Sequence, residues 1–476
     1  MNIDNQIDTF FAPIADTVSS IVFYGVPISE TQNVQLILLW LAGAAVFFTV
    51  YLGFINFRYF KHAVDLVCGK FDGPKKDGEI TRFQALATSL SGTVGLGNIA
   101  GVAAAISLGG PGAVVWMVIM AFFSMTTKFA EVMLAVKYRH VNPQTNAISG
   151  GPMYYLKDAF AHWDIPYLGG VVAVIFAICC IGGSLGGGNM FQANQAAQQI
   201  MNISGGQGGF FGDKGWLLGL ILAVMVGVVI IGGIKSIANV ASKLVPLMGV
   251  IYLAAGIIVI AVNYANIPDA FAVMFAEALN PQAGLGGFIG VLLVGVQRAA
   301  FSNEAGLGSA AIVHANAATD DAVSQGFVGM LGPFIDTVII CLVTALMIVI
   351  SGAYQNVDGV QGVALTSAAM ETGVSWFPYV LALTVFLFAY STMITWSYYG
   401  SKCVTYLFGE KPVVDIAYKL LFCICIIIGA SSQLDNIIAF TDAMILSMGI
   451  PNIIGLYLLA PVIRKDVKVY IQKLKN

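Results

Sequence analysis

The sequence predicts an all-α protein that crosses a membrane many times. Of its 476 residues, 58% are hydrophobic and only 10% are charged, and the mean hydropathy is +0.84. Soluble globular domains do not have this composition. The apolar residues form continuous runs, which favours membrane helices over a β-barrel. The net charge of −3 and the lack of any Lys/Arg-rich run exclude nucleic acid as a partner and leave the lipid bilayer.

Eleven apolar runs are long enough to span a bilayer, and residues 1–33 precede them. These first residues carry Asp4, Asp8 and Asp16 but no Lys or Arg, so they lack the basic start of a cleaved signal peptide. We expect a retained extracytoplasmic segment at the membrane surface. The runs lie at residues 34–57, 83–108, 111–137, 167–200, 216–234, 237–263, 284–313, 326–352, 376–401, 414–432 and 437–463.

Lys and Arg residues are unevenly distributed between the connecting loops. With eleven spans, the basic clusters fall on one side, and the loops at 264–283, 353–375 and 433–436, which have no Lys or Arg, fall on the other. The positive-inside rule then predicts a multi-pass protein of the plasma (inner) membrane, with its amino terminus outside and its carboxyl terminus in the cytoplasm. The clusters are Arg58, Lys61, Lys70, Lys75, Lys76 and Arg82; Lys137 and Arg139; Lys235 and Lys243; Lys402 and Lys411; and Arg464, Lys465, Lys468, Lys473 and Lys475.

The second apolar run contains the stretch SGTVGLGNIAG, residues 91–101. It has four glycines in eleven positions, and each costs about 1 kcal/mol relative to alanine in a helix interior. We therefore predict that this span unwinds near its middle. Close packing of two helices is the alternative explanation for such small residues.

A matching stretch, GVQRAAFSNEAGLGSAAIVHA at residues 295–315, occurs in the seventh run. Its AGLGS segment resembles VGLGN of the first stretch. Since five positions separate the second and seventh runs, the two spans cross the membrane in opposite directions, as in an inverted five-plus-five repeat. The predicted organisation is an extra helix at 34–57, a first repeat at 83–263, a second repeat at 284–463 and a tail at 464–476. Two facing breaks would offer amides to a carboxylate and carbonyls to a cation.

From about residue 83 to its end, the chain resembles the alanine or glycine:cation symporter family. The resemblance rests on FQALATSLSGTVGLGNIAGVA, GGPGAVVWM with TKFAEVMLAVKYR, GGPMYYL, GNMFQANQ and FSNEAGLGSA. The sequence departs from the family's GGxGAxFWMW pattern at Val115 and Val118, and Ser124 stands where glycine is usual. The resemblance implies a leucine-transporter-like fold and sodium symport of alanine or glycine by alternating access. It implies no enzymatic activity and no cofactor besides the transported sodium ion.

The substrate site is expected between the two breaks. The fourth run contains a cluster of side-chain amides. Because amides in lipid are costly unless they have hydrogen-bond partners, we expect this cluster to line a pocket. The resemblance points to the first break and to a wall formed by the ninth run. The candidate substrate-binding residues are Thr93, Gly95, Gly97, Asn98, Phe191, Gln192, Gln195, Ser302, Asn303, Gly306, Thr392 and Trp396.

The ninth run, FAYSTMITWSYYG, supplies the candidate sodium ligands. The resemblance places this helix beside the first break, where the hydroxyl oxygens of Ser391 and Thr392 would join backbone carbonyls near Thr93. All-oxygen ligands suit a hard cation. Helical Ser and Thr hydroxyls also bond to their own backbone, which is the structural alternative.

Charged residues inside the runs leave two alternatives open. We favour structural ion pairs for Arg298 with Glu304 and for Lys128 with Glu131, whereas Asp336 is either a cation or proton site or a hydrogen-bonded structural group.

A proton-coupled carrier of another small solute is therefore an alternative function, and a channel, which needs a continuous polar pore, is another. No hydrolase constellation or phosphate-binding motif is present in the sequence. The oligomeric state is left open.

The topology can be tested by the accessibility of single cysteines introduced at residues 360 and 470. We expect a membrane-impermeant thiol reagent to label residue 360 from outside intact cells and residue 470 only after permeabilisation, because the basic clusters lie on the side of the carboxyl terminus. Labelling of both residues from the same side would contradict the eleven-span topology.

Overall fold

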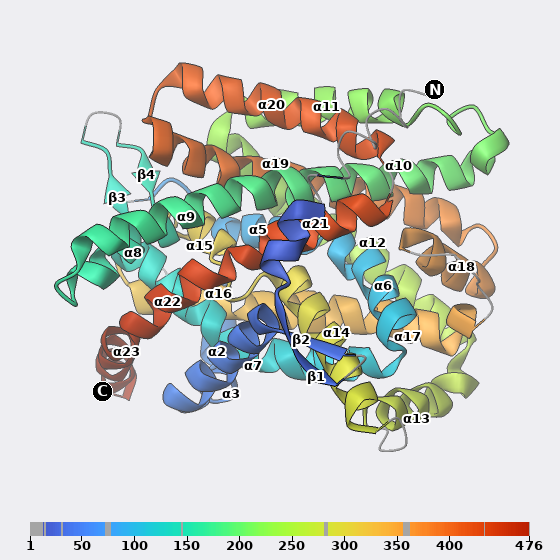
Figure 1. Ribbon diagram of the computed structural model, residues 1–476, viewed down its shortest axis with the longest axis horizontal. Helices are drawn as coiled ribbons and strands as arrows, with labels where there is room; N and C mark the ends of the chain where they lie inside the picture. Colours follow the sequence, from blue (N-terminus) through green and yellow to red (C-terminus); the bar gives the residue numbers. More distant parts are fainter. Residues whose placement is uncertain are drawn as a thin grey trace.

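The computed structural model describes residues 13, 16–29, 32–71, 78–143, 146–279, 284–355, 362–432 and 434–475. In these residues the fold consists of packed helices (Figure 1) and two antiparallel hairpins. One hairpin pairs β1 (Gly25–Ser29) with β2 (Gln32–Gln35), and the other pairs β3 (His140–Val141) with β4 (Ile148–Ser149). Most residues of the predicted 1–33 segment that precede β1 lie outside the described residues. Residue 360, the outer position of the labelling experiment, also lies outside them.

The described helices cover all eleven predicted runs. Their bounds are α2 (Leu36–Tyr51), α3 (Ile55–Arg58), α4 (Phe60–Val67), α5 (Arg82–Thr93), α6 (Ala100–Gly109), α7 (Gly112–Lys137), α8 (Pro152–Ala161), α9 (Pro166–Leu185), α10 (Phe191–Ile203), α11 (Gly215–Ile230), α12 (Gly233–Val262), α13 (Ile267–Ala278), α14 (Gly284–Asn303), α15 (Ser309–His314), α16 (Ala322–Pro333), α17 (Leu342–Ile350), α18 (Val363–Gly373), α19 (Phe377–Phe408), α20 (Pro412–Ser431), α21 (Leu434–Ser447), α22 (Gly449–Leu458) and α23 (Ala460–Lys475).

Within the described residues, seven helical segments are long and apolar enough to cross a membrane. Helices that continue directly into one another, such as α9 and α10, count here as one segment. The bent pair of α5 and α6 makes an eighth when it is counted as one span. The apolar helices α2, α11 and the described part of α14 are shorter, at 10–17 residues. The structure therefore supports a multi-pass membrane protein, while the count of eleven spans stays a prediction.

The outer helices present apolar side chains outward. Val224 and Val228 on α11, Val250 and Ile257 on α12, and Leu420 on α20 are each more than half exposed. Single exposed apolar residues are common in soluble proteins, but rows of them on neighbouring helices are the surface that lipid covers. The outward faces of these helices are therefore suited to contact with lipid.

The first predicted break is present. Thr81 caps the start of α5 through a reciprocal pair of hydrogen bonds with Gln84. The helix ends at Thr93, a short 3₁₀ turn, η1 (Leu96–Asn98), follows, and α6 then departs at an angle of 58°. The extended backbone of Gly95, with φ −134° and ψ −153°, separates the two halves. The glycine-rich stretch thus forms the break that its composition predicts.

The second break is also present, between α14 and α15. Gly306 and Gly308 have φ values of +86° and +80°, which glycine adopts at little cost. Glu304 has a φ of +55° although it carries a side chain. Such backbone is uncommon for a non-glycine residue and persists only where its surroundings hold it.

Two π-helical turns widen other spans near the breaks. The first, η2 (Gly186–Met190), joins α9 and α10 into the long helix that crosses the molecule in Figure 1. The second, η6 (Phe334–Cys341), follows Pro333, whose missing amide proton removes one helical hydrogen bond. Each turn brings a side chain or a small backbone surface toward the breaks.

The segments that carry the predicted basic clusters share one end of the molecule. Glu79 Oε1 accepts a hydrogen bond from the Ile148 amide, and Lys402 Nζ donates to the Ile148 carbonyl, both at 3.0 Å. Lys137 forms an ion pair with Asp466 of α23. The β3–β4 hairpin and α23 both lie at the left of Figure 1. This clustering agrees with the charge asymmetry on which the topology rests.

Candidate functional site

The two breaks lie side by side in the interior and are joined by polar side chains. Asn98 Nδ2, in the first break, donates to Ser302 Oγ at the end of α14 over 3.3 Å. Asn98 also donates to the carboxylate and, over 3.2 Å, to the backbone carbonyl of Asp336. All three residues are at most 1% exposed. Their hydrogen bonds connect the two breaks directly.

Asp336 on η6 is the shared acceptor of this group. Its Oδ2 accepts from Ser302 Oγ at 2.6 Å and from Thr337 Oγ1 at 2.9 Å, while Asn98 donates to Oδ1. The sequence left Asp336 open between a cation or proton site and hydrogen-bonded structure. Its hydrogen bonds to residues of both breaks were not visible in the sequence, because 238 positions separate it from Asn98.

A small cavity of about 10 Å³, lined by buried residues, lies between the breaks, with room for about one water molecule. Of the candidate substrate-binding residues, Thr93, Gly97, Gln192 and Trp396 line it. Its remaining lining residues are Gly92, Gly187, Phe301, Glu304 and Ile445. Phe301 and Glu304 belong to the quoted motif FSNEAGLGSA, so the sequence held a signal for them, whereas nothing in the sequence distinguished Ile445.

Gln192 ties α10 to the first break. Its Oε1 accepts from the Leu96 amide at 3.0 Å, and its Nε2 donates to the Gly187 carbonyl at 2.9 Å. The Leu96 amide is one of the donors that the break frees from helical pairing. The neutral side-chain oxygen of Gln192 therefore accepts from a backbone amide that could instead donate to a carboxylate.

Trp396 of α19 joins the breaks on another side of the cavity. Its Nε1 donates to the Gly92 carbonyl at 3.2 Å and to Glu304 Oε1 at 3.0 Å. The indole packs against η2 so closely that a Cβ on Gly188 would lie 2.1 Å from Trp396 Cγ. Glycine at position 188 thus makes room for the tryptophan.

The two candidate sodium ligands differ in where their hydroxyls point. Thr392 Oγ1 donates to the Ser91 carbonyl at 3.0 Å, and a Cβ on Gly95 would lie 2.5 Å from the same oxygen. The Ser391 hydroxyl instead donates to the Phe388 carbonyl of its own helix at 3.0 Å. Neutral oxygens beside the break suit an alkali cation. Among the described residues no group of His, Cys, Asp and Glu has the arrangement of a transition-metal site.

Several other candidates lie near the breaks but do not line the cavity. Phe191 packs edge to face on Phe301, with ring centroids 5.4 Å apart. Asn303 donates to Thr337 Oγ1 at 3.2 Å and accepts from a backbone amide of its own break. Gln195 lies further away, where its Oε1 accepts from the Val363 amide at the start of α18 over 3.0 Å.

Glu131 of α7 holds the second break. Its Oε2 accepts hydrogen bonds of 3.1 Å from the amides of Gly306 and Gly308 and from Asn452 Nδ2 of α22. Lys128 Nζ lies 3.6 Å from Glu131 Oε1 and donates to the Asn303 carbonyl at 3.0 Å. The expected structural ion pair of Lys128 with Glu131 is therefore confirmed, and it anchors Gly306 of the break to two helices.

The expected ion pair of Arg298 with Glu304 was wrong. Arg298 pairs with Asp442 of α21 instead. Six helical positions correspond to a rotation of about 240°, so residues 298 and 304 would face different directions even before the helix ends at Asn303. Glu304 accepts hydrogen bonds from Ser309 and Trp396.

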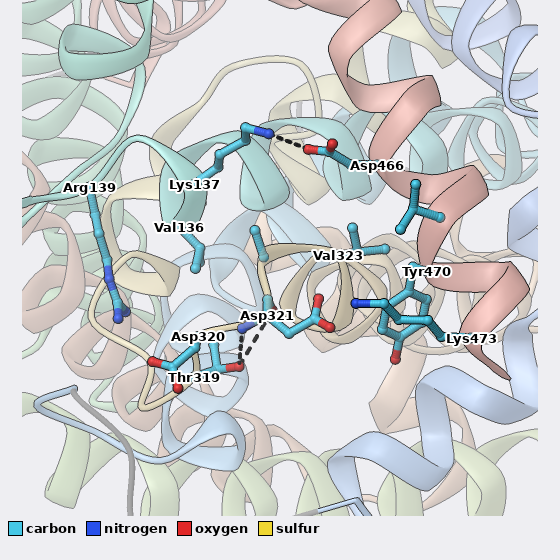
Figure 2. Close-up of a pocket in the computed structure, with 12 residues that line it drawn as sticks. Val136, Lys137, Arg139, Thr319, Asp320, Asp321, Val323, Asp466, Tyr470 and Lys473 are labelled. Carbon is cyan, nitrogen blue, oxygen red and sulfur yellow. Dashed lines mark hydrogen bonds and ion pairs between the residues drawn. The ribbon is translucent and has the colours of Figure 1, made fainter.

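A larger cavity of about 590 Å³ lies away from the breaks, between α7, the loop before α16 and α23. Figure 2 shows its charged wall, with the ion pair of Lys137 and Asp466 and with Asp320, Asp321 and Lys473 around it. It contains residues of the basic clusters rather than any of the candidate site residues. Its position assigns it to the charged end of the molecule and not to the substrate site.

Comparison with known proteins identifies relatives over nearly the whole chain. The model of the sodium:alanine symporter family matches residues 22–476. The sodium/alanine symporter AgcS of Methanococcus maripaludis is 38% identical over 442 residues, which are 92% of this chain and 95% of AgcS. The "Probable sodium/glutamine symporter GlnT" of Bacillus subtilis is 32% identical over 444 residues, which are 93% and 89% of the two chains.

A solved structure shares the fold. The crystal structure of MhsT in complex with L-phenylalanine aligns with a TM-score of 0.53 at 15% sequence identity. The alignment covers 83% of this chain and 99% of that one. At this identity the likeness concerns the leucine-transporter-like arrangement of helices alone.

Replacement of Glu131 tests how the second break is held. We expect Glu131→Gln to lower the melting temperature of the purified protein, because Lys128 loses its counter-charge and a broken buried pair costs about 3–5 kcal/mol. The double variant Lys128→Met/Glu131→Gln removes both charges and should recover part of the loss.

The matched control is Glu371→Gln, which makes the same change at an exposed carboxylate on α18. We expect the control to melt like the unmodified protein. Equal melting temperatures for Glu131→Gln and the control would show that the pair does not hold the break.

Proposed function

Because the chain belongs to the sodium:alanine symporter family, we propose that it imports a small neutral amino acid, alanine or glycine, together with sodium. A cation-coupled amino-acid symporter is what the family supports, and this is a transporter rather than an enzyme. The identity of the amino acid, the direction and the mechanism are the proposed part.

The observation that carries the proposal is the small buried cavity between two broken helices. The break at Leu96 offers a backbone amide, now paired with Gln192 Oε1, to the carboxylate of an amino acid. Phe301, Trp396 and Ile445 close the cavity with bulky side chains. A site walled in this way favours a substrate with a very small side chain.

Sodium would bind on the other side of the first break, at Thr392 Oγ1 and the Ser91 carbonyl. Ser91 directly precedes Gly92 and Thr93, which line the cavity. A cation at Ser91 would fix the backbone that forms one wall of the substrate site. The two ligands would then stabilise the same arrangement of the break, and this shared free energy couples their binding.

Transport requires the cavity to enlarge, because about 10 Å³ does not hold an amino acid. We propose that the structure represents a closed state between an outward-open and an inward-open state. The proposed topology is an inverted repeat with eleven spans in the plasma membrane, with the amino terminus outside and the carboxyl terminus in the cytoplasm. The hydrogen bonds of Asn98 and Trp396 across the breaks are the contacts that opening would have to change.

Two alternatives stay as outcomes of the test. The relative named for glutamine directs attention to a larger amino acid, and the buried carboxyl of Asp336 directs attention to coupling by protons. Each predicts a different response to the imposed gradient or to the labelled substrate.

Uptake of radiolabelled alanine into proteoliposomes tests the proposed function. We expect accumulation when sodium is high outside and none when only a proton gradient is imposed. Unlabelled glycine should compete, and leucine should not, because its branched side chain would overlap the cavity wall. Uptake that follows the proton gradient and ignores sodium would contradict the proposal, as would competition by glutamine that equals competition by alanine.

Separate replacement of the two hydroxyls tests the sodium site. We expect Thr392→Ala to raise the sodium concentration for half-maximal uptake more than tenfold, about 1.4 kcal/mol, because the hydroxyl oxygen beside Ser91 is lost. Thr392→Ser keeps that oxygen and should restore most of the affinity. Ser391→Ala should have a smaller effect, since its hydroxyl bonds within its own helix. An unchanged sodium dependence in Thr392→Ala would assign the hydroxyl to structure.

A further inference from the structure

We propose that the carboxylate of Glu304 binds the ammonium group of the transported amino acid. This assignment rests on the proposed function and adds the residue that distinguishes an amino acid from a carboxylic acid without an amine.

Glu304 is placed in the wall of the cavity by an unusual backbone. It directly follows α14, and its φ of +55° is one of only a few positive values at non-glycine positions in the described residues. Its side chain reaches the cavity, and the residue is 2% exposed. An uncommon backbone conformation at a carboxylate that lines a buried cavity is typical of a functional group.

The carboxylate of Glu304 accepts hydrogen bonds from two neighbouring side chains. Ser309 Oγ donates to Oε2 and Trp396 Nε1 donates to Oε1. Among the residues that the structure describes, Glu304 forms no direct ion pair: Arg298 pairs with Asp442, and Lys128 pairs with Glu131 and acts on Glu304 only from a longer distance. A buried carboxylate is costly without a positive partner. Each of its oxygens can accept a second hydrogen bond, so an ammonium can bind without displacing Ser309 or Trp396.

The other buried carboxyls near the breaks are less suited to this task. Glu131 is paired with Lys128, and one of its carboxylate oxygens already accepts three hydrogen bonds. Asp336 accepts from Asn98, Ser302 and Thr337 and does not line the cavity. Asp442 is paired with Arg298. Glu304 is therefore the acidic group that meets a ligand in the cavity.

The assignment also orients the substrate. Gln192 and Glu304 both line the cavity, and Gln192 Oε1 marks the backbone amide at Leu96 that would take the carboxylate. With its ammonium on Glu304 and its carboxylate toward Leu96, a zwitterion spans the gap between the two breaks. A buried charge then rejects an analogue that lacks the amine, because Glu304 would be left without a partner.

The test compares alanine with lactate, which replaces the amine by a hydroxyl. Binding to the purified protein in sodium is measured by calorimetry for the unmodified protein, Glu304→Gln, Glu304→Asp and the exposed control Glu371→Gln. We expect the unmodified protein and the control to bind alanine at least 100-fold more tightly than lactate. Glu304→Gln should lose at least 30-fold in alanine affinity, and its preference for alanine over lactate should fall below about threefold.

Glu304→Asp keeps the charge and guards against a folding defect in the glutamine variant. It should bind alanine more weakly but retain the preference over lactate. An unchanged preference in Glu304→Gln would overturn the proposal, whether alanine affinity is retained or both affinities fall together. So would loss of the preference in Glu304→Asp.

Binding of radioactive sodium without any amino acid separates this role from a sodium site. We expect Glu304→Gln to bind sodium like the unmodified protein, and a loss of more than tenfold would make Glu304 a sodium ligand and overturn the proposal. The unmodified protein alone tests the proposed function. If it binds no amino acid, the proposed function fails and the assignment of Glu304 fails with it, whereas failure in the variants alone leaves the proposed function standing.

Discussion

A helix break inside a membrane protein frees backbone amides and carbonyls in a region where the surrounding lipid offers them no partner, and this constraint shapes the whole interior. Each free group costs several kcal/mol unless a partner is supplied. In this chain the partners are side chains from distant helices. Gln192 accepts from the first break, and Glu131 and Asn452 bind the second. The breaks therefore exist only because the surrounding helices supply partners for them.

The same constraint explains why polar side chains are buried in so apolar a protein. Asn98, Ser302 and Thr337 meet at Asp336, and none of them is more than 1% exposed. Such a network fixes one arrangement when every member is satisfied. It also makes the breaks the natural place for change, since a ligand that supplies other partners can replace part of the network.

Local composition predicted the breaks well, because glycine acts on the backbone of its own segment. The glycines at 92–101 and 306–308 lie at the observed breaks, and Thr93, Gly97, Gln192 and Trp396 do line one cavity. Partners that come from elsewhere in the chain could not be predicted. Asp442 and Ile445 lie on a helix without a distinctive motif, so neither the pairing of Arg298 nor that part of the cavity wall was visible. The wrong pairing of Arg298 with Glu304 came from treating nearness in sequence as nearness in space.

The balance of charge around the breaks gives a physical reason for coupling an amino acid to a cation. Glu131, Glu304 and Asp336 supply three acidic groups, and Lys128 supplies one basic group; when all are ionised, the sum is −2. The neutral pair of Arg298 and Asp442 does not change it. A zwitterion alone leaves the sum at −2, whereas a zwitterion with one sodium ion brings it to −1. In a medium of low dielectric constant, this reduction favours the doubly loaded site over the site that holds only the amino acid.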